Sequence, residues 1–430
     1  MHISAHLDVD VIAVETEDQV SVLIELTAPP APDNAAPRSP STLEVVLDRS
    51  GSMSGPRIDG AKLALQRLID RLDPTDNFGL VAFDDRVEIV VPAGPLTDKP
   101  SAKSAIGALD ARGTTDLSGG YLRGLQEARR AARESGATVL LVSDGHANAG
   151  VTDPDRLEGI AADARGRGIT TSSLGFGLGY DERIMSALAR GGAGSELFAE
   201  EPDTAVGLIA GEVEGLLAQT AQAASLLVRP TAAVRAVQVV NDLPVTATAD
   251  GIVAELGSFY ADEIRKIVLV LEVPGIAALG LTQVATLEFT YVELPALKQH
   301  TVSVPLHVNV VPGDQAAGRV ADPAVRTELV YLRAQQAKRR ASTHLSAGDA
   351  EAALKEIRAA QESVSRAMAD APPELVADLA EEVESLSYLA NETQSGLITR
   401  AAKYSSSDAY GKSSKRGRTT PPSTPEPPTL

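Results

Sequence analysis

Residues 45–55 read VVLDRSGSMSG. An apolar run ends at Asp48, and the hydroxyl side chains of Ser50 and Ser52 follow at alternate positions. One carboxylate and two hydroxyls this close together form either a tight turn or part of a cage for a hard cation, which prefers oxygen ligands. Two serines beside a glycine are, taken alone, more typical of a solvated turn. Other segments of the chain are therefore needed to distinguish a turn from a cation site.

Strand and helix patterns alternate between residues 43 and 220. The strand candidates are nearly all apolar, which is typical of strands buried on both faces of a parallel sheet. They cover 43–47, 78–83, 87–91, 138–143, 169–176 and 196–199. The helical patterns between them cover 57–72, 101–110, 118–134, 154–166, 181–190 and 203–219. This alternation predicts an α/β domain with a doubly wound, mostly parallel, Rossmann-like sheet.

The segments on both sides of the α/β domain read as β structure. Residues 1–30 contain two Val- and Ile-rich runs and predict a β-hairpin, and residues 31–42 form a Pro-rich linker. Residues 222–312 contain short β runs separated by turn residues, which is typical of an antiparallel β-sandwich. Because an isolated hairpin is marginally stable in water, we expect it to join this sandwich. The α/β domain would then be inserted between strands of the sandwich.

The C-terminal part of the chain is first helical and then low in complexity. Residues 321–403 are rich in Ala and Leu and predict about three helices, separated near Gly348 and near Pro372. Residues 404–430 are rich in Ser, Pro and Thr, with a small basic cluster. Such a segment does not bury enough apolar surface to offset its ordering entropy, so we predict a disordered tail.

The overall composition excludes several classes of function. The chain has 430 residues, a net charge of -19, 3% aromatic residues and no cysteine. The missing cysteine excludes disulfides, thiol catalysis and zinc–thiolate sites. The negative charge and the scarce aromatic side chains oppose nucleic-acid binding. There is no apolar run near the ~20 residues of a membrane span and no signal-peptide pattern, so we expect a cytoplasmic protein without membrane insertion. Nothing in the sequence indicates the oligomeric state.

Two further oxygen-bearing segments are expected near Asp48. RGTTDLSGG (112–120) is a glycine-flanked loop that leads into a predicted helix, and Asp144 follows the apolar strand at 138–143. The ligand crevice of a parallel sheet lies beyond the carboxyl ends of its strands, so these segments should meet there. Hydroxyls and carboxylates without His or Cys suit Mg²⁺, with Mn²⁺ or Ca²⁺ as substitutes. The side chains expected to converge are Asp48, Ser50, Ser52, one of Thr114 or Thr115, and Asp144.

This pattern resembles the von Willebrand factor type A (VWA) domain and its metal-ion-dependent adhesion site. The family motif is D-x-S-x-S after the first strand, a Thr in a G-x-T loop, and an Asp in a strand-end D-G. The matching segments are Asp48-Arg49-Ser50-Gly51-Ser52, Gly113-Thr114-Thr115-Asp116 and Ser143-Asp144-Gly145. The family threonine is carried onto Thr115, because family loops usually read G-G-T followed by Asp or Asn. Residues 256–274 are also similar to the β segment that follows this domain in bacterial proteins of this kind.

The resemblance implies a binding function rather than catalysis. Mg²⁺ would be held by the serines, the threonine and the two aspartates, and a Glu or Asp carboxylate of a protein partner would take the open position. We therefore expect a metal-dependent protein-binding module of scaffold or adhesion type that is not an enzyme. Asp116 is expected to cap the helix that follows it.

Two alternatives use the same site. One is a metal-assisted hydrolase, for which His146 is the base closest in sequence. The other is a purely structural metal that pins three loops. A serine hydrolase is disfavoured because no G-x-S-x-G elbow is present. The glycine run at 175–179 lacks the trailing Lys-Ser/Thr of a phosphate-binding loop, so it is expected to let the strand end approach the metal loops.

Overall fold

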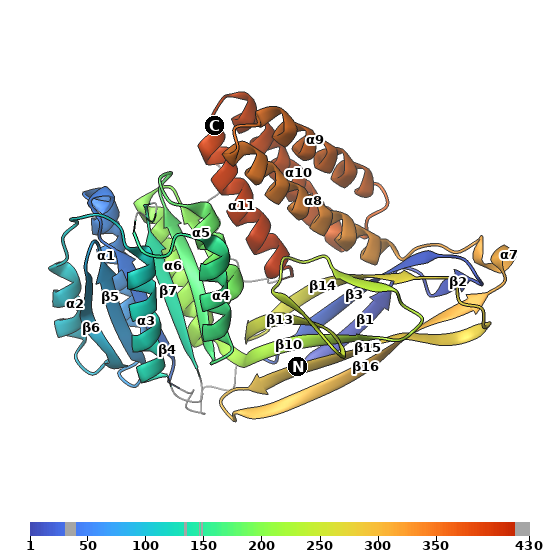
Figure 1. Cartoon of the computed structure of the whole chain (residues 1–430), viewed down its shortest axis with the longest axis horizontal. Helices are drawn as coiled ribbons and strands as arrows, with labels where there is room; N and C mark the ends of the chain where they lie inside the picture. Colours follow the sequence, from blue (N-terminus) through green and yellow to red (C-terminus); the bar gives the residue numbers. More distant parts are fainter. Residues whose placement is uncertain (31–39, 133–135, 146, 148, 418–430) are drawn as a thin grey trace.

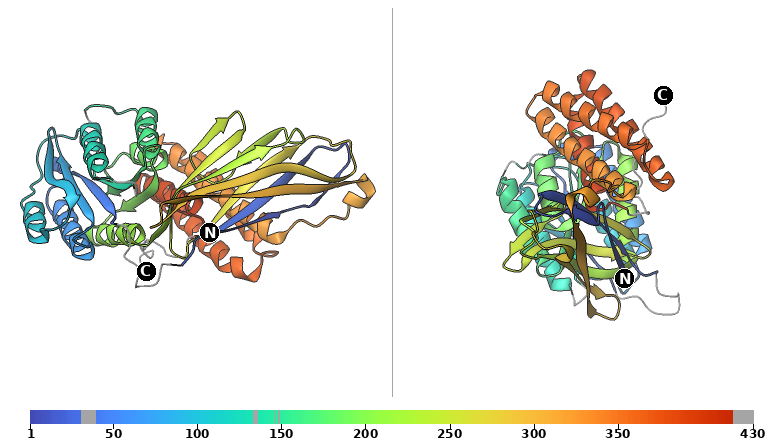
Figure 2. Two further views of the ribbon diagram at one scale, coloured as in Figure 1. Left: turned by 90° about the horizontal axis from the view of Figure 1, so that it is seen from below. Right: turned by 90° about the vertical axis from the view of Figure 1, so that its right-hand side faces the viewer.

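The computed structural model describes residues 1–30, 40–132, 136–145, 147 and 149–417. It contains an α/β domain, an elongated β-sandwich, and a helical region that lies over the junction between them (Figure 1). Seen from below, the α/β domain occupies one end of the molecule and the sandwich strands extend towards the other (Figure 2). This architecture confirms the predicted fold, an α/β domain inserted in a β-sandwich and followed by helices.

The sheet of the α/β domain is mixed only at one edge. Its strands are β4 (Thr42–Asp48), β5 (Asn77–Phe83), β6 (Val87–Pro95), β7 (Ala137–Ser143), β8 (Ile169–Phe176) and β9 (Ala193–Ala199). The spatial order is β6-β5-β4-β7-β8-β9, and β6 alone among these pairs antiparallel to its neighbour. Every residue of β4, β5 and β7 is buried, because helices cover both faces of the sheet.

Two hydrophobic clusters, one on each face of this sheet, attach the helices of the α/β domain. The first cluster includes side chains of α1 (Pro56–Arg71), α2 (Lys99–Gly107) and α6 (Pro202–Leu217). The second includes side chains of α3 (Leu117–Ala131), α4 (Pro154–Arg165) and α5 (Glu182–Gly191). The sheet is therefore a rigid platform whose strand ends can hold loops in fixed positions.

The β-sandwich is built from strands on both sides of the inserted domain. Its strands are β1 (His2–Leu7), β2 (Val11–Ala13), β3 (Asp18–Thr27), β10 (Gln219–Pro230), β11 (Ala236–Val239), β12 (Val245–Thr248), β13 (Gly251–Tyr260), β14 (Ile264–Val273), β15 (Gly280–Glu293) and β16 (Lys298–Val311). One sheet has the order β1-β3-β14-β11 and the other β12-β13-β10-β15-β16-β2. The N-terminal segment thus reaches both sheets, since β1 pairs with β3 while β2 pairs in parallel with β16.

The helical region holds four long helices in its described part rather than the expected three. After the short α7 (Gly313–Ala316), they are α8 (Pro323–Ser346), α9 (Ala350–Ala367), α10 (Pro373–Gln394) and α11 (Ile398–Ser414). The last helix crosses the boundary expected after residue 403, so the prediction of a disordered tail from 404 is wrong for 404–414. Residues 418–430 lie outside the described part.

Helix α11 is stable because small side chains let it pack closely and find polar partners. Ser405 Oγ donates to the Lys338 carbonyl in α8 at 2.7 Å. Tyr410 is buried, and its hydroxyl donates to the Gly194 carbonyl in β9 at 3.0 Å. Directly after α11, the Arg416 carbonyl accepts a hydrogen bond from the Lys266 N–H of the sandwich at 2.8 Å. The helix therefore joins all three parts of the molecule. No described helix is long and apolar enough to span a membrane.

Candidate metal centre

Backbone hydrogen bonds bring the three predicted loops together. Asp48 ends β4 and Asp144 directly follows β7, and these strands are neighbours in the parallel sheet. The Gly51 N–H, in a short 3-10 turn at Gly51–Met53, donates to the Gly113 carbonyl at 3.1 Å. The Arg112 N–H donates to the Arg49 carbonyl at 2.7 Å. Ser52 and Asp144, which are 92 positions apart in the sequence, thus lie together at the carboxyl ends of the strands.

The serine hydroxyls and Asp144 form a continuous set of oxygen atoms. Ser52 Oγ donates to Asp144 Oδ1 at 2.7 Å. Ser50 Oγ and Ser52 Oγ lie 3.0 Å apart. Ser50 and Asp144 are buried, whereas Ser52 is exposed. The set therefore opens to solvent on the side of Ser52.

The position of Gly145 shows that Thr115 and Asp48 belong to the same set. A Cβ atom built on Gly145 would lie 3.3 Å from Thr115 Oγ1, 3.5 Å from Ser52 Oγ and 3.7 Å from Asp48 Oδ2. Thr115 is buried, whereas Thr114 is exposed. The structure therefore brings together all five residues singled out from the sequence, with Thr115 rather than Thr114 among them.

The electrostatics of the cluster suit a cation. Asp48 is fully buried, and it accepts hydrogen bonds from Ser143 Oγ at 2.6 Å and from the Ser50 N–H at 2.8 Å. Burial raises the pKa of Asp48 and the nearby charge of Asp144 adds to this, although the two hydrogen bonds oppose the shift. A positive charge, the guanidinium of Arg57, contacts Asp144 Oδ2 at 2.5 Å. Two buried carboxylates with hydroxyls around them fit a hard divalent ion such as Mg²⁺.

The hydroxyl groups are essential to this fit. Among the described residues, no group of three or more His, Cys, Asp or Glu side chains is arranged to hold a metal ion. The cluster has two carboxylates, so three of its five oxygen-bearing side chains are serine or threonine. The two carboxylates match the charge of a divalent ion, but five side chains do not fill all six positions that Mg²⁺ prefers, so a carboxylate from outside can complete the shell.

Comparison with known proteins identifies the part of the chain that carries this cluster. The family model for the von Willebrand factor type A domain matches residues 43–209. Residues 43–209 are a VWA domain. The predicted family resemblance is therefore confirmed. VWA domains are generally protein-interaction modules, metal-dependent adhesion is typical of them, and most are not enzymes.

Individual relatives extend the similarity beyond the VWA domain. An uncharacterized protein of Synechocystis sp. is 28% identical over 335 residues, which cover 74% of this chain and 76% of that protein. Human inter-alpha-trypsin inhibitor heavy chain H3 is 27% identical over 163 residues, which span only 18% of its length. The crystal structure of the ArnB paralog VWA2 from Sulfolobus acidocaldarius superposes with a TM-score of 0.65 at 17% identity. That match covers 97% of this chain and 98% of the other, so the whole architecture recurs there.

Asp84, which the sequence analysis does not single out, connects the loops of the VWA domain. Its buried carboxylate accepts hydrogen bonds from Arg49 Nε at 2.9 Å, Arg112 Nε at 3.0 Å and the Arg86 N–H at 2.7 Å. Burial alone would raise the pKa of Asp84, but the bonds and charges of these groups lower it. Its carbonyl also accepts from the Asp116 N–H at 2.9 Å. The only sequence signal for this role is its place directly after β5.

Two other predicted residues have different outcomes. Asp116 caps α3 as expected, since its side chain accepts from the Gly119 N–H at 2.9 Å. His146, the base of the hydrolase alternative, lies outside the described residues.

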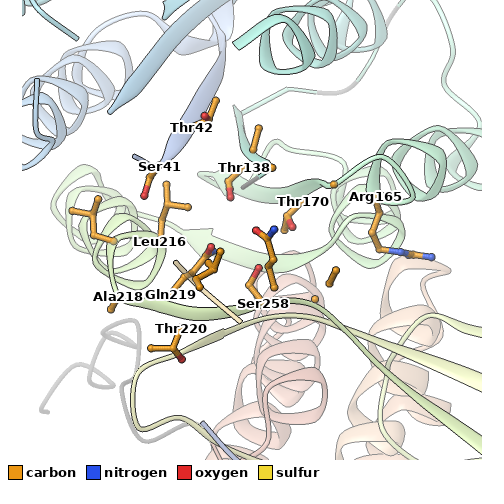
Figure 3. Close-up of a pocket in the computed structure, with 18 of the residues that line it drawn as sticks. Ser41, Thr42, Thr138, Arg165, Thr170, Leu216, Ala218, Gln219, Thr220 and Ser258 are labelled. Atoms are coloured by element: carbon orange, nitrogen blue, oxygen red, sulfur yellow. The ribbon is translucent and has the colours of Figure 1, made fainter. Parts of the chain in front are cut away.

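A separate cavity lies at the opposite end of the VWA strands, away from the metal loops. It has a volume of about 520 Å³ and lies between the amino ends of the VWA strands and the sandwich (Figure 3). Thr42, Thr138 and Thr170 line it from the starts of β4, β7 and β8, and Gln219 and Thr220 line it from β10. Because the metal loops follow the carboxyl ends of the same strands, this cavity and the oxygen cluster are distinct features of the domain.

Proposed function

We propose that this protein is a Mg²⁺-dependent protein-binding module that captures an acidic side chain of a partner protein. The observation that carries the proposal is the convergence of five oxygen-bearing side chains from three chain segments at one solvent-facing rim. The family supports a binding role, since VWA domains are generally interaction modules. Absence of catalysis and a cytoplasmic location are parts of the same proposal.

Each residue of the cluster has a role in this proposal. The hydroxyl oxygens of Ser50, Ser52 and Thr115 are direct ligands, and the carboxylates of Asp48 and Asp144 balance the charge directly or through water. A bound Mg²⁺ would supply an open coordination position that accepts one oxygen of the partner carboxylate. The exposed Ser52 sets the side from which the partner approaches.

The adjacent threonines offer a matched test of this function. Thr115→Ala removes a buried hydroxyl of the cluster, whereas Thr114→Ala removes an exposed hydroxyl one residue away. Each variant and the unchanged protein are immobilised in Mg²⁺ or in EDTA and used to capture proteins from an extract, which are then identified by mass spectrometry. We expect a partner that binds the unchanged protein and Thr114→Ala in Mg²⁺ but not in EDTA, and that Thr115→Ala loses.

Other outcomes distinguish the alternatives. Capture that is equally strong in EDTA contradicts metal-dependent recognition. Metal uptake that raises the melting temperature while no carboxylate-bearing partner binds indicates a structural metal. Metal-dependent turnover of phosphate or ester substrates that disappears in His146→Ala supports the hydrolase instead.

A further inference from the structure

An arginine outside the family motif lies at the opening of the metal cluster. Arg57 belongs to the first turn of α1, two residues after Gly55. Its Nη1 contacts Asp144 Oδ2 at 2.5 Å and donates to the Ser52 carbonyl at 3.2 Å. The Arg57 side chain is 38% exposed, whereas the Asp144 side chain is fully buried. A surface cation is thus paired with a buried carboxylate of the cluster.

The glycine run at 175–179 makes room for this arrangement. A Cβ atom built on Gly177, whose φ is +73°, would lie 3.0–3.2 Å from three atoms of the Arg57 guanidinium. A Cβ atom on Gly179 would lie 2.9 Å from the Asp144 carbonyl oxygen. The backbone of this loop therefore runs against both the arginine and the aspartate. This close packing accounts for Gly177 and Gly179 without any phosphate ligand.

The contact places Arg57 in competition with a metal ion. A guanidinium bonded to Asp144 Oδ2 and a divalent cation held by the same cluster repel each other, and both use Asp144. Metal uptake therefore favours release of Arg57 from Asp144. The released guanidinium stays attached to α1 at the exposed side of the cluster, where a partner carboxylate would arrive. A planar guanidinium suits this task, since its paired N–H groups match the two oxygens of a carboxylate.

We propose that Arg57 controls both metal uptake and carboxylate recognition at this site. This inference rests on the metal-dependent function proposed above. In the metal-free protein Arg57 is the internal counter-ion of Asp144 and weakens metal uptake. In the metal-loaded protein Arg57 binds the second oxygen of the partner carboxylate, whose first oxygen is on the metal. The site then selects a carboxylate over a neutral oxygen ligand such as an amide or a hydroxyl.

The test separates metal uptake from carboxylate binding and uses the full chain. Manganese is the metal probe, followed by its electron paramagnetic resonance signal in the absence of any added carboxylate. Acetate is the carboxylate probe, and acetamide is its neutral match. Binding of each is followed through relaxation of its methyl protons by bound manganese. The variants are Arg57→Ala, Arg57→Lys and, as a control, Arg86→Ala, which removes an exposed arginine from the β5–β6 loop.

The inference predicts opposite changes in the two readouts. Arg57→Ala should bind manganese about fivefold more tightly, as expected from loss of a partly exposed ion pair. The same variant should bind acetate at least about fivefold more weakly and should lose the preference for acetate over acetamide. Arg57→Lys should keep manganese affinity near that of the unchanged protein but bind acetate more weakly, because lysine lacks the planar fork. Arg86→Ala should change neither affinity.

Three results overturn the inference. Unchanged manganese and acetate affinities in Arg57→Ala remove both parts of it. Tighter manganese binding with unchanged acetate binding removes the recognition role. Equal effects of Arg86→Ala and Arg57→Ala show that general charge, rather than this contact, is responsible. Absence of manganese uptake by the unchanged protein is a different result, since it contradicts the proposed function itself.

Discussion

Glu44→Gln should stabilise the protein increasingly as the pH rises. Glu44 is fully buried in β4, and neither of its carboxylate oxygens has a hydrogen-bond partner among the described residues. It occupies space left by a glycine, since a Cβ atom on Gly79 would lie 1.9 Å from Glu44 Oε2. Burial, together with the charge of Glu127, raises the pKa of Glu44 from 4.5 to about 9. Its carboxyl group is therefore protonated in the folded protein at neutral pH.

The sign and size of the effect follow from proton linkage. Between pH 4.5 and about 9 the folded protein keeps the Glu44 proton while the unfolded chain releases it. The free energy of unfolding therefore falls as the pH rises, by about 1.4 kcal/mol for each pH unit from this group. At about pH 7 the accumulated loss is about 3 kcal/mol relative to the acid end of the window. Glutamine has nearly the same size and does not ionise, so the variant lacks this loss.

Urea unfolding followed by circular dichroism measures the difference at several pH values. From about pH 5.5 to about pH 8.5 the stability of Glu44→Gln should rise relative to the unchanged protein by about 4 kcal/mol. Glu201→Gln, which alters an exposed glutamate of the same domain, serves as the control and should show no such trend. A difference between Glu44→Gln and the unchanged protein that stays constant with pH would refute a buried, protonated Glu44.

Two further substitutions test the packing around the metal loops and the helical region. Gly175→Ala should lower the free energy of unfolding by about 2 kcal/mol. The added Cβ atom would lie 2.4 Å from the Tyr180 ring. An unchanged melting temperature would contradict this contact. Lys403→Met should loosen α11 by about 3 kcal/mol, because Lys403 Nζ binds Glu182 at 2.8 Å and the Tyr180 carbonyl at 2.5 Å. Hydrogen exchange of residues 398–414 measures this, and protection equal to that of the unchanged protein would show that the buried ion pair does not hold the helix.

The parallel sheet and the oxygen cluster are predictable because their signals are local. Strands such as β4 and β7 are continuous apolar runs, and the polar residues that follow them must lie at the same edge of the sheet. The D-x-S-x-S segment, the threonine loop and Asp144 each stand directly after or between such elements. Their meeting is therefore expected from the rule that ligands bind beyond the carboxyl ends of parallel strands, together with the family motif.

Features that depend on long-range partners are not predictable from one sequence. The pairing of β2 with β16 joins residues about 300 positions apart, and nothing in the VIA segment indicates it. Helix α11 has Ser and Ala at buried positions, so its apolar periodicity is weak although α8 and β9 cover it. Asp84 and Arg57 have ordinary turn and helix positions, and their roles arise only from side chains that approach from other segments.

The central claim is that the oxygen cluster takes up a hard divalent ion, and calorimetric titration with Mg²⁺ tests it most directly. The unchanged protein should show a heat of binding that saturates, and Asp48→Asn, which keeps the side-chain size but removes a buried charge, should show none. An unchanged protein that takes up neither Mg²⁺ nor Mn²⁺, or an Asp48→Asn variant that binds as well as the unchanged protein, would contradict the metal site at this rim of the sheet.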